Sequence, residues 1–127
     1  MRIEHVAIFV KDLEKSKNFY KVYFNALNNY KYSNPSKGFE SYFLTFKGGC
    51  RLEIMTKSGI TPHKGTEEIF GFSHLAFSVG NKKEVDRLTF RLKEDGYTIL
   101  GNPRTTGDGY YESIILDPDG YRVEITE

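Results

Sequence analysis

The sequence contains the same pattern twice, and this duplication limits the folds open to the chain more than any other feature. The stretch EHVAIFV, residues 4–10, aligns with SHLAFSV, residues 73–79, histidine on histidine. Two further segments repeat in the same order: FESYFL from Phe39 with YESIIL from Tyr111, and RLEI from Arg51 with RVEI from Arg122. The order of the matches indicates a tandem duplication of one module.

Each copy contains one predicted helix after its first strand. In the first copy, Asp12 can cap a helix that runs through about Asn28. In the second copy, Asn81 followed by Glu84 has the Asn-x-x-Glu form of a capping box, and Gly96 supplies a left-handed stop. The apolar positions expected to face the core are Leu13, Tyr20, Phe24 and Leu27 in the first helix, and Val85, Leu88 and Leu92 in the second.

Three strands are predicted after each helix, so each copy is a βαβββ module. They cover residues 30–33, 39–46 and 51–56, and then residues 97–100, 110–116 and 121–126. Tight turns, KGG from Lys47 and DPDG from Asp117, join the last two strands of each copy. We therefore expect an α+β fold in a single domain of residues 1–127, with modules at 1–56 and 71–127 and a linker at 57–70.

Side-chain alternation assigns a face to the repeated histidines and glutamates. Successive residues of a strand point to opposite faces, and the apolar residues should face the helix of their own module. The apolar residues are Val6, Ile8, Val10, Leu52 and Ile54 in the first module, and Leu75, Phe77, Val79, Val123 and Ile125 in the second. His5, Glu53, His74 and Glu124 then point away from the helices. Two modules placed edge to edge, within one chain or between two chains, would curl their sheets into a cup around these four side chains.

The composition excludes several classes of protein. The formal net charge is +1, with basic and acidic residues interspersed, so we expect no binding to nucleic acid. The single Cys50 cannot form a disulfide within the chain, which is typical of a reducing compartment. The sequence shows neither a signal peptide nor an apolar run long enough to cross a membrane. We therefore expect a cytoplasmic protein that does not bind membranes.

The duplicated plan resembles the vicinal oxygen chelate superfamily over essentially the whole chain. This superfamily includes glyoxalase I, fosfomycin-resistance proteins, methylmalonyl-CoA epimerase, extradiol dioxygenases and bleomycin-resistance proteins. The run DPDGYRVEI, residues 117–125, is similar to the turn and glutamate strand of many members. The resemblance implies a glyoxalase-like fold, in which tandem βαβββ modules form the cup.

The resemblance also implies a metal site. Members of the superfamily hold a metal ion with residues of the first and fourth strands, and the matching positions are His5, Glu53, His74 and Glu124. Two imidazoles and two carboxylates suit one divalent ion such as Ni, Co, Zn, Mn or Fe(II). Structural pairing of each histidine with its glutamate is the alternative. Two carboxylates inside one cup need a compensating cation, however, which favours the metal.

If the mechanism resembles that of glyoxalase I, Glu53 and Glu124 are also the catalytic base and acid. The metal ion would stabilise the charge that develops on a carbonyl oxygen when a proton leaves the adjacent carbon. The two carboxylates would remove and return that proton. The resemblance thus implies a lyase or isomerase similar to lactoylglutathione lyase, acting on a small oxygenated substrate.

The sequence differs from glyoxalase I at the positions of the basic residues that bind glutathione in that enzyme. Phe9 stands where an arginine is usual, and Arg104 is the only cation of PRTTGDGY, residues 103–110. Because an anion needs positioned donors, a smaller ligand than a glutathione adduct is favoured. Small members of the superfamily often dimerise, so the expected partners are a small-molecule substrate and a second copy in a homodimer.

Other functions remain open within the same superfamily. A fosfomycin-type resistance enzyme could use His5, His74 and Glu124 as ligands and Glu53 as a base. An acyl-CoA epimerase also moves a proton beside a carbonyl. An extradiol dioxygenase fits less well, because its iron site resembles a two-His, one-carboxylate set and its chains are usually longer. A metal-free binding protein similar to the bleomycin-resistance members is the alternative from another class.

The remaining polar and aromatic residues receive structural roles. Glu40 and Glu112 align in the repeat, but the pattern around Glu40 leaves their face open. His63, in the predicted linker, is expected to be solvated. The DPDG turn needs no ligand role, and the aromatic residues are assigned to the core and the cup wall rather than to a base-stacking surface.

Overall fold

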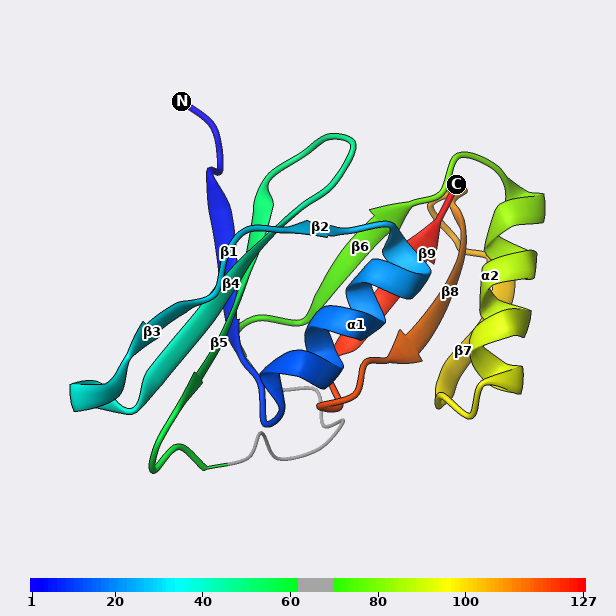
Figure 1. Cartoon of the computed structure of the whole chain (residues 1–127). Helices are drawn as coiled ribbons and strands as arrows, with labels where there is room; N and C mark the ends of the chain where they lie inside the picture. Colours follow the sequence, from blue (N-terminus) through cyan, green and yellow to red (C-terminus); the bar gives the residue numbers. More distant parts are fainter. Residues whose placement is uncertain (62–69) are drawn as a thin grey trace. The chain divides into compact units, whose positions relative to one another are not determined.

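The protein divides into two compact units, Met1–Pro62 and His63–Glu127, in a computed structural model that describes residues 1–61 and 70–127. Each unit is a mixed β-sheet with one α-helix packed on it (Figure 1). The chain is therefore α+β, with a helix and a sheet in each half as the duplication predicts. Part of the predicted linker, including His63, lies outside the described residues.

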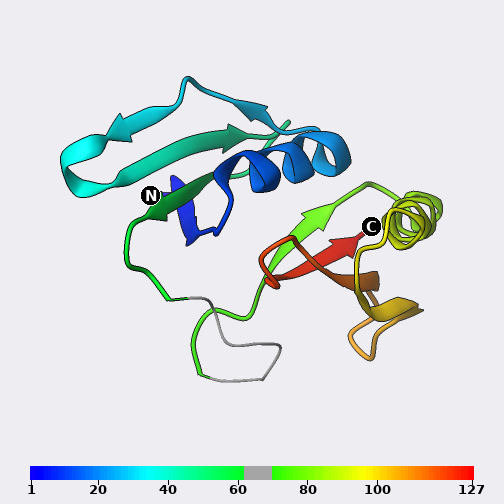
Figure 2. The same ribbon diagram turned by 60° about the horizontal axis from the view of Figure 1, so that its bottom comes forward.

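The first unit has a sheet of five strands. Its elements are β1 (His5–Phe9), α1 (Leu13–Phe24), β2 (Leu27–Asn28), β3 (Tyr32–Asn34), a short 3-10 helix (Pro35–Lys37), β4 (Phe39–Thr45) and β5 (Arg51–Lys57). The strand order is β1-β5-β4-β2, and β3 also pairs with β4. β1 is parallel to β5, whereas β4 is antiparallel to its neighbours. Figure 2 shows β2 and β3 following one another along β4, so together they supply the second strand of the βαβββ plan.

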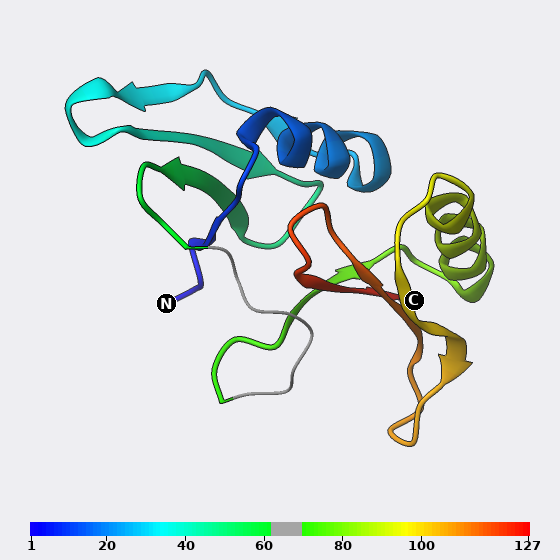
Figure 3. The same cartoon turned by 90° about the horizontal axis from the view of Figure 1, so that it is seen from below.

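The second unit repeats this topology with four strands. Its elements are β6 (His74–Ser78), α2 (Lys82–Glu94), β7 (Ile99–Thr105), β8 (Tyr111–Leu116) and β9 (Arg122–Thr126). The order is β6-β9-β8-β7, with β6 parallel to β9 and the other pairs antiparallel. α2 packs against β7, β8 and β9 (Figure 3). The first and last strands of each unit are thus parallel neighbours, which brings the repeated histidine and glutamate strands side by side.

The first helix begins where predicted but ends earlier. The Asp12 carboxylate accepts a hydrogen bond of 2.9 Å from the backbone N–H three residues later. The helix ends at Phe24 because Asn25 adopts the left-handed conformation, with φ 54°, which asparagine tolerates better than most residues. The prediction that Leu27 is a buried helical residue is therefore wrong, since Leu27 lies exposed in β2.

The second helix has both of its predicted ends. The Asn81 side chain accepts a hydrogen bond of 3.1 Å from the Glu84 backbone N–H. At the other end, Gly96 has φ 86°, and the N–H groups of Gly96 and Tyr97 bond to carbonyls of the last turn at 3.0 and 2.9 Å. This pattern is a Schellman motif. Among the described residues, no helix is long and apolar enough to cross a membrane.

β7 extends further than the sequence predicts. The predicted strand stops at Leu100, whereas β7 continues to Thr105. Its pairing with β8 shifts register on both sides of Gly101, and these irregularities accommodate Pro103. β7 is also the edge of its sheet, where a proline without an N–H is tolerated.

Alternation of buried and exposed residues along the strands agrees with the prediction. In β1 and the residue after it, Ile8 and Val10 are buried, while His5, Ala7 and Phe9 are exposed. Each fully buried apolar side chain contributes about 1.5–3 kcal/mol to folding. The buried residues include Leu13, Phe19, Tyr20, Phe24, Leu44, Leu52 and Ile54 in the first unit, and Val85, Leu88, Leu92, Ile115, Val123 and Ile125 in the second. Each helix therefore covers one face of its own sheet, and the histidines and glutamates belong to the other face.

Candidate metal site

His5 and Glu53 form a pair on the first sheet. β1 and β5 are parallel neighbours in which Ala7 lies opposite Glu53, so His5 projects from the same face two residues earlier. Nε2 of His5 lies 3.9 Å from Oε2 of Glu53. The glutamate side chain is 16% exposed and the imidazole 40%. The two side chains share a face, as strand alternation predicts, and the small Ala7 leaves space beside them.

His74 and Glu124 form an equivalent pair on the second sheet. Ala76 lies opposite Glu124 in the parallel pairing of β6 with β9. Nε2 of His74 lies 3.5 Å from Oε2 of Glu124, and the two side chains are 42% and 17% exposed. Each unit thus presents one imidazole nitrogen toward one carboxylate oxygen, with a small alanine opposite the glutamate.

Within each pair, the distance between the imidazole nitrogen and the carboxylate oxygen would allow both atoms to bind the same cation. Both distances are at or beyond the limit for a direct hydrogen bond. Two atoms that each lie about 2.1 Å from one metal ion are at most about 4.2 Å apart, and both pairs meet this limit. In the part of the chain that the structure describes, no three His, Cys, Asp or Glu side chains gather closely enough to hold a metal ion. The geometry of each pair therefore suits two ligands of one cation, and the remaining coordination positions would belong to other donors.

The second nitrogen of each histidine also has a partner. Nδ1 of His5 lies 2.6 Å from a carboxylate oxygen of Glu4, which in turn accepts a hydrogen bond of 2.8 Å from Nε of Arg51. These hydrogen bonds, first from His5 and then from Arg51, lower the pKa of Glu4. Nδ1 of His74 lies 3.1 Å from the hydroxyl oxygen of Ser73. Sequence reasoning missed Glu4 and Ser73, although both directly precede the histidines.

Phe43 lines the first pair. It lies opposite Glu53 in the β4–β5 pairing, and its ring meets the His5 ring edge to face at 5.3 Å between centroids. The Arg51 guanidinium lies 4.2 Å from the centroid of the same ring. Phe43 therefore gives the pair an apolar wall, and the Arg51 guanidinium packs on the same ring.

Glu112 lies on the face of the second sheet that carries Glu124. In the β8–β9 pairing, Glu112 is opposite Thr126 and Ile114 is opposite Glu124. Burial and then the charge of Glu124 raise the pKa of Glu112. Nη2 of Arg104, which is opposite Glu112 on β7, lies 3.6 Å from its carboxylate. The second unit thus adds a carboxylate and a guanidinium to the face of its pair.

Glu40 has a different environment from Glu112, although the two glutamates align in the repeat. Glu40 lies opposite Thr56, on the helix-side face that also carries Tyr42. Its carboxylate lies 3.6 Å from Nζ of Lys31, as expected for a structural residue. The repeat alignment placed the two glutamates together because FES and YES match, whereas strand pairing aligns Ser41 with Glu112.

The DPDG turn uses its first aspartate structurally. Oδ1 of Asp117 accepts hydrogen bonds of 2.9 Å from the N–H groups of both Asp119 and Tyr121. Gly120 completes the turn with φ 87°. The turn fixes the start of β9, and so the position of Glu124, without contributing a ligand of its own.

Comparison with known proteins identifies the relatives of this chain. Residues 2–125 match the model of the Glyoxalase/Bleomycin resistance protein/Dioxygenase superfamily. An uncharacterised Bacillus subtilis protein, YqjT, is 28% identical over 97% of this chain and 96% of its own length. The crystal structure of a glyoxalase family protein from Enterococcus faecalis matches 99% of this chain and 97% of its own, with a TM-score of 0.81 and 28% identity.

Glyoxalase I from Zea mays is a further structural neighbour. Its crystal structure matches 98% of this chain with a TM-score of 0.80 and 25% identity. The chain spans only 44% of the length of the maize enzyme. The similarity therefore covers both βαβββ units of this chain but less than half of the maize enzyme.

Proposed function

The chain belongs to the glyoxalase/bleomycin resistance protein/dioxygenase superfamily, and we propose that it is a metal-dependent lyase or isomerase of the glyoxalase I type. One observation carries the proposal: both units hold a histidine and a glutamate at the same strand positions, at distances that suit a shared cation. Structural similarity to maize glyoxalase I supports the same reaction type.

The proposed ligands are His5, Glu53, His74 and Glu124, bound to one divalent ion such as Ni, Co, Zn, Mn or Fe(II). Two carboxylates neutralise the charge of the ion, and six-coordination leaves two positions for substrate oxygens or water. Each pair alone is a poor site, because two protein ligands leave most of the coordination to solvent. Sharing one ion explains why the pair occurs twice.

The glutamates would move the proton. When bound, the ion supplies a Lewis acid that polarises a carbonyl oxygen of the substrate. A carboxylate oxygen of Glu53 or Glu124 takes a proton from the carbon next to that carbonyl. A carboxylate of the same two glutamates then returns the proton to the carbon of the former carbonyl. The imidazoles of His5 and His74 and the other glutamate would continue to hold the ion while one glutamate leaves it to take up the proton.

The substrate is proposed to be smaller than a glutathione adduct. Phe9, on the same face of β1 as His5, is apolar where glyoxalase I usually has an arginine. On the second sheet, Arg104 and Arg122 both project from the face of Glu124, and the Arg104 guanidinium lies beside the Glu112 carboxylate. A small oxygenated compound needs fewer anion-binding groups than glutathione does.

A substrate panel tests the proposal. Metal-loaded protein is assayed with hemithioacetals of α-oxoaldehydes, with fosfomycin and thiols, and with methylmalonyl-CoA. Glu53→Gln and Glu124→Gln should each lower turnover of the accepted substrate by about 10²-fold or more, because each removes a group that transfers the proton. Glu40→Gln is the matched control, since Glu40 lies on the opposite face of the sheet.

The outcome separates the candidate functions. Unchanged turnover in both site variants would contradict the proton-transfer scheme. Thiol addition to fosfomycin would favour the resistance enzyme, and epimerisation of the acyl-CoA would favour the epimerase. A protein that binds no metal and turns over no substrate would instead belong with the metal-free binding members of the superfamily.

A further inference from the structure

The imidazole of His5 is contacted on several sides. Nδ1 lies 2.6 Å from Oε2 of Glu4, and Nε2 points toward Glu53 at 3.9 Å. The ring packs edge to face on Phe43, with an interplanar angle of 88°. The ring can therefore neither flip nor tilt without breaking a contact.

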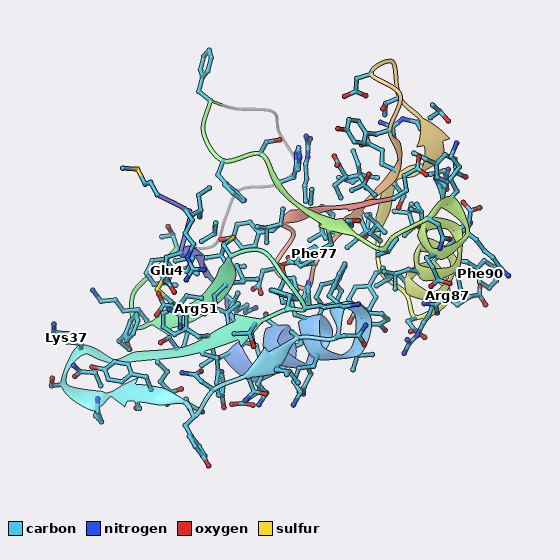
Figure 4. All side chains as sticks on the ribbon, turned by 90° about the horizontal axis from the view of Figure 1, so that it is seen from above. Glu4, Lys37, Arg51, Phe77, Arg87 and Phe90 are labelled. Atoms are coloured by element: carbon cyan, nitrogen blue, oxygen red, sulfur yellow. The ribbon has the colours of Figure 1, made fainter. Side chains whose placement is uncertain are left out.

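Glu4 is held in place by Arg51 on the neighbouring strand. Nε of Arg51 donates a hydrogen bond of 2.8 Å to the Glu4 carboxylate, and the Arg51 backbone N–H donates one of 3.1 Å to the Glu4 carbonyl. Figure 4 shows Glu4 and Arg51 beside one another. The Arg51 guanidinium also lies over Phe43. His5, Glu4, Arg51 and Phe43 thus form a closed ring of contacts beside Glu53.

These contacts specify which nitrogen of His5 carries the proton. An ionised carboxylate has no hydrogen to donate, so in the short contact with Glu4 the Nδ1–H of His5 must be the donor. A neutral imidazole then has its lone pair on Nε2, directed toward Glu53. Metal-binding histidines commonly donate their other N–H to a carboxylate, which fixes the tautomer and makes the ligand nitrogen more basic.

The second unit has a weaker form of this arrangement. Ser73 stands at the position equivalent to Glu4, and its hydroxyl contacts Nδ1 of His74 at 3.1 Å. A hydroxyl can either donate or accept, so it does not impose one tautomer on the ring. It is also neutral and raises the basicity of the imidazole less than a carboxylate does. The two histidines therefore differ in how firmly they are prepared for a ligand role.

We propose that Glu4 is a positioning residue that fixes His5 as the Nδ1–H tautomer, with Nε2 ready to bind the metal ion, and that Arg51 holds Glu4 in place. The inference rests on the proposed metal site. Glu4 itself would touch neither metal nor substrate. Its contact would leave Nε2 of His5 more fully oriented for metal binding than Nε2 of His74, which has only the Ser73 hydroxyl beside its ring.

Nitrogen NMR of the ring tests this role without metal. The uniformly ¹⁵N-labelled, metal-free protein is studied at about pH 8.5, above the ordinary pKa of histidine, where long-range ¹H–¹⁵N spectra distinguish the tautomers. The chain has three histidines, so His63→Asn and His74→Asn assign the signals. Wild-type His5 should carry its proton on Nδ1. Glu4→Ala should move it toward Nε2, whereas Glu4→Gln, whose amide oxygen still accepts, should keep it on Nδ1.

Metal titration of the same variants gives the second readout. Glu4→Ala should raise the dissociation constant for Zn²⁺ or Co²⁺ about 10- to 100-fold, with a smaller change in Glu4→Gln and in Ser73→Ala. Glu84→Ala is the matched control, because it removes a glutamate that accepts a 2.8 Å hydrogen bond from Nε of Arg87 and, among the described residues, bonds to no histidine. It should change neither the tautomer nor the affinity.

The two claims fail separately. A proton on Nε2 in the wild type, or an unchanged tautomer in Glu4→Ala, would overturn the role of Glu4 even if the protein binds metal. A wild-type protein that binds no metal would overturn the proposed site. In that case the tautomer alone decides whether Glu4 positions His5.

Discussion

Ser41 and Glu112 occupy equivalent positions in the two units. Ser41 lies opposite Met55, two residues after Glu53, and Glu112 lies opposite Thr126, two residues after Glu124. The second unit thus carries a carboxylate where the first carries a hydroxyl. The duplication has kept the histidine–glutamate pair but changed what stands next to it.

Replacing Glu112 should affect folding and metal binding in opposite directions. Burial and the charge of Glu124 disfavour the ionised form of Glu112. Glu112→Gln removes this cost, so the free energy of unfolding of the metal-free protein should rise at neutral pH. The same change removes negative charge near a bound cation, so metal affinity should fall. Urea unfolding and metal-dependent thermal shifts measure the two effects.

Glu40→Gln is the control for this substitution. It removes a glutamate of similar strand position that pairs with Lys31 on the opposite face. Its effect on stability should be small and its effect on metal affinity absent. A larger loss of stability in Glu112→Gln than in Glu40→Gln would mean that the ion pair with Arg104 outweighs the repulsion from Glu124.

Glu14 should make the first unit sensitive to acid. Its carboxylate accepts a hydrogen bond of 2.9 Å from the Tyr42 hydroxyl and pairs with Lys17 and Lys31. The hydrogen bond from Lys17, followed by that from Tyr42, lowers the pKa of Glu14 from 4.5 to about 2. The resulting stabilisation is complete above about pH 4.5 and is lost as the pH falls toward 2.

The measurement is urea unfolding of Glu14→Gln and wild type across this pH range. Because the Glu14 side chain is 48% exposed, the variant should lose only about 1 kcal/mol or less at neutral pH. The difference should shrink toward zero near pH 2. A difference that stays constant with pH would show that packing rather than charge at Glu14 stabilises the unit.

Thr89 and Ser113 link α2 to β8 by a buried hydrogen bond with a definite direction. Thr89 Oγ1 lies 2.7 Å from the Val85 carbonyl and 2.6 Å from Ser113 Oγ. Since the single hydroxyl proton of Thr89 goes to the carbonyl, Ser113 is the donor in the second bond. Thr89→Val leaves a buried Ser113 hydroxyl without this acceptor and should cost about 1–3 kcal/mol.

Replacing the donor, Ser113, should cost less stability than replacing Thr89. Ser113→Ala leaves the bond from Thr89 to Val85 intact, so we expect a cost below that of Thr89→Val, and the double variant should recover part of the loss. The free energies of unfolding of the three variants, measured in urea, form a double-mutant cycle. Equal costs for both single variants would contradict the assigned direction.

Gly96 tests the end of the second helix. Its φ of 86° is unfavourable for a residue with a Cβ, whereas an added Cβ would meet no atom within 4 Å. Gly96→Ala should therefore cost about 1–2 kcal/mol through backbone conformation alone. Gly48→Ala is the matched control, because Gly48 has equal space and no positive φ. A thermal melt in which both variants lose the same stability would contradict the assignment.

The sequence predicts best where the signal is local. The Asn81 cap and the Gly96 stop define α2 from single residues whose chemistry is specific to helix ends. Alternation along β1 and β5 correctly placed His5 and Glu53 on one face, because a strand has a period of two and a shift would expose its apolar residues.

Four features were not predicted, and three of them depend on contacts between distant segments. The left-handed turn at Asn25 ends α1 although Leu27 continues an apolar helical pattern. β7 passes through Gly101 and Pro103 only because register shifts at a sheet edge accommodate them. The face of Glu112 follows from the β8–β9 register. The similarity of FES to YES instead aligns Glu112 with Glu40, which lies on the other face of its sheet. Glu4 was missed because its contact with His5 depends on Arg51, on another strand.

The number of metal ions bound per chain tests the central claim most directly. Wild-type protein, His5→Ala and His74→Ala are dialysed with excess of the ion that gives the largest thermal shift, freed of unbound metal, and analysed for metal content. If both pairs share one ion, the wild type binds one per chain and each variant loses it. Two ions per chain in the wild type, or one ion retained in either variant, would contradict a shared site.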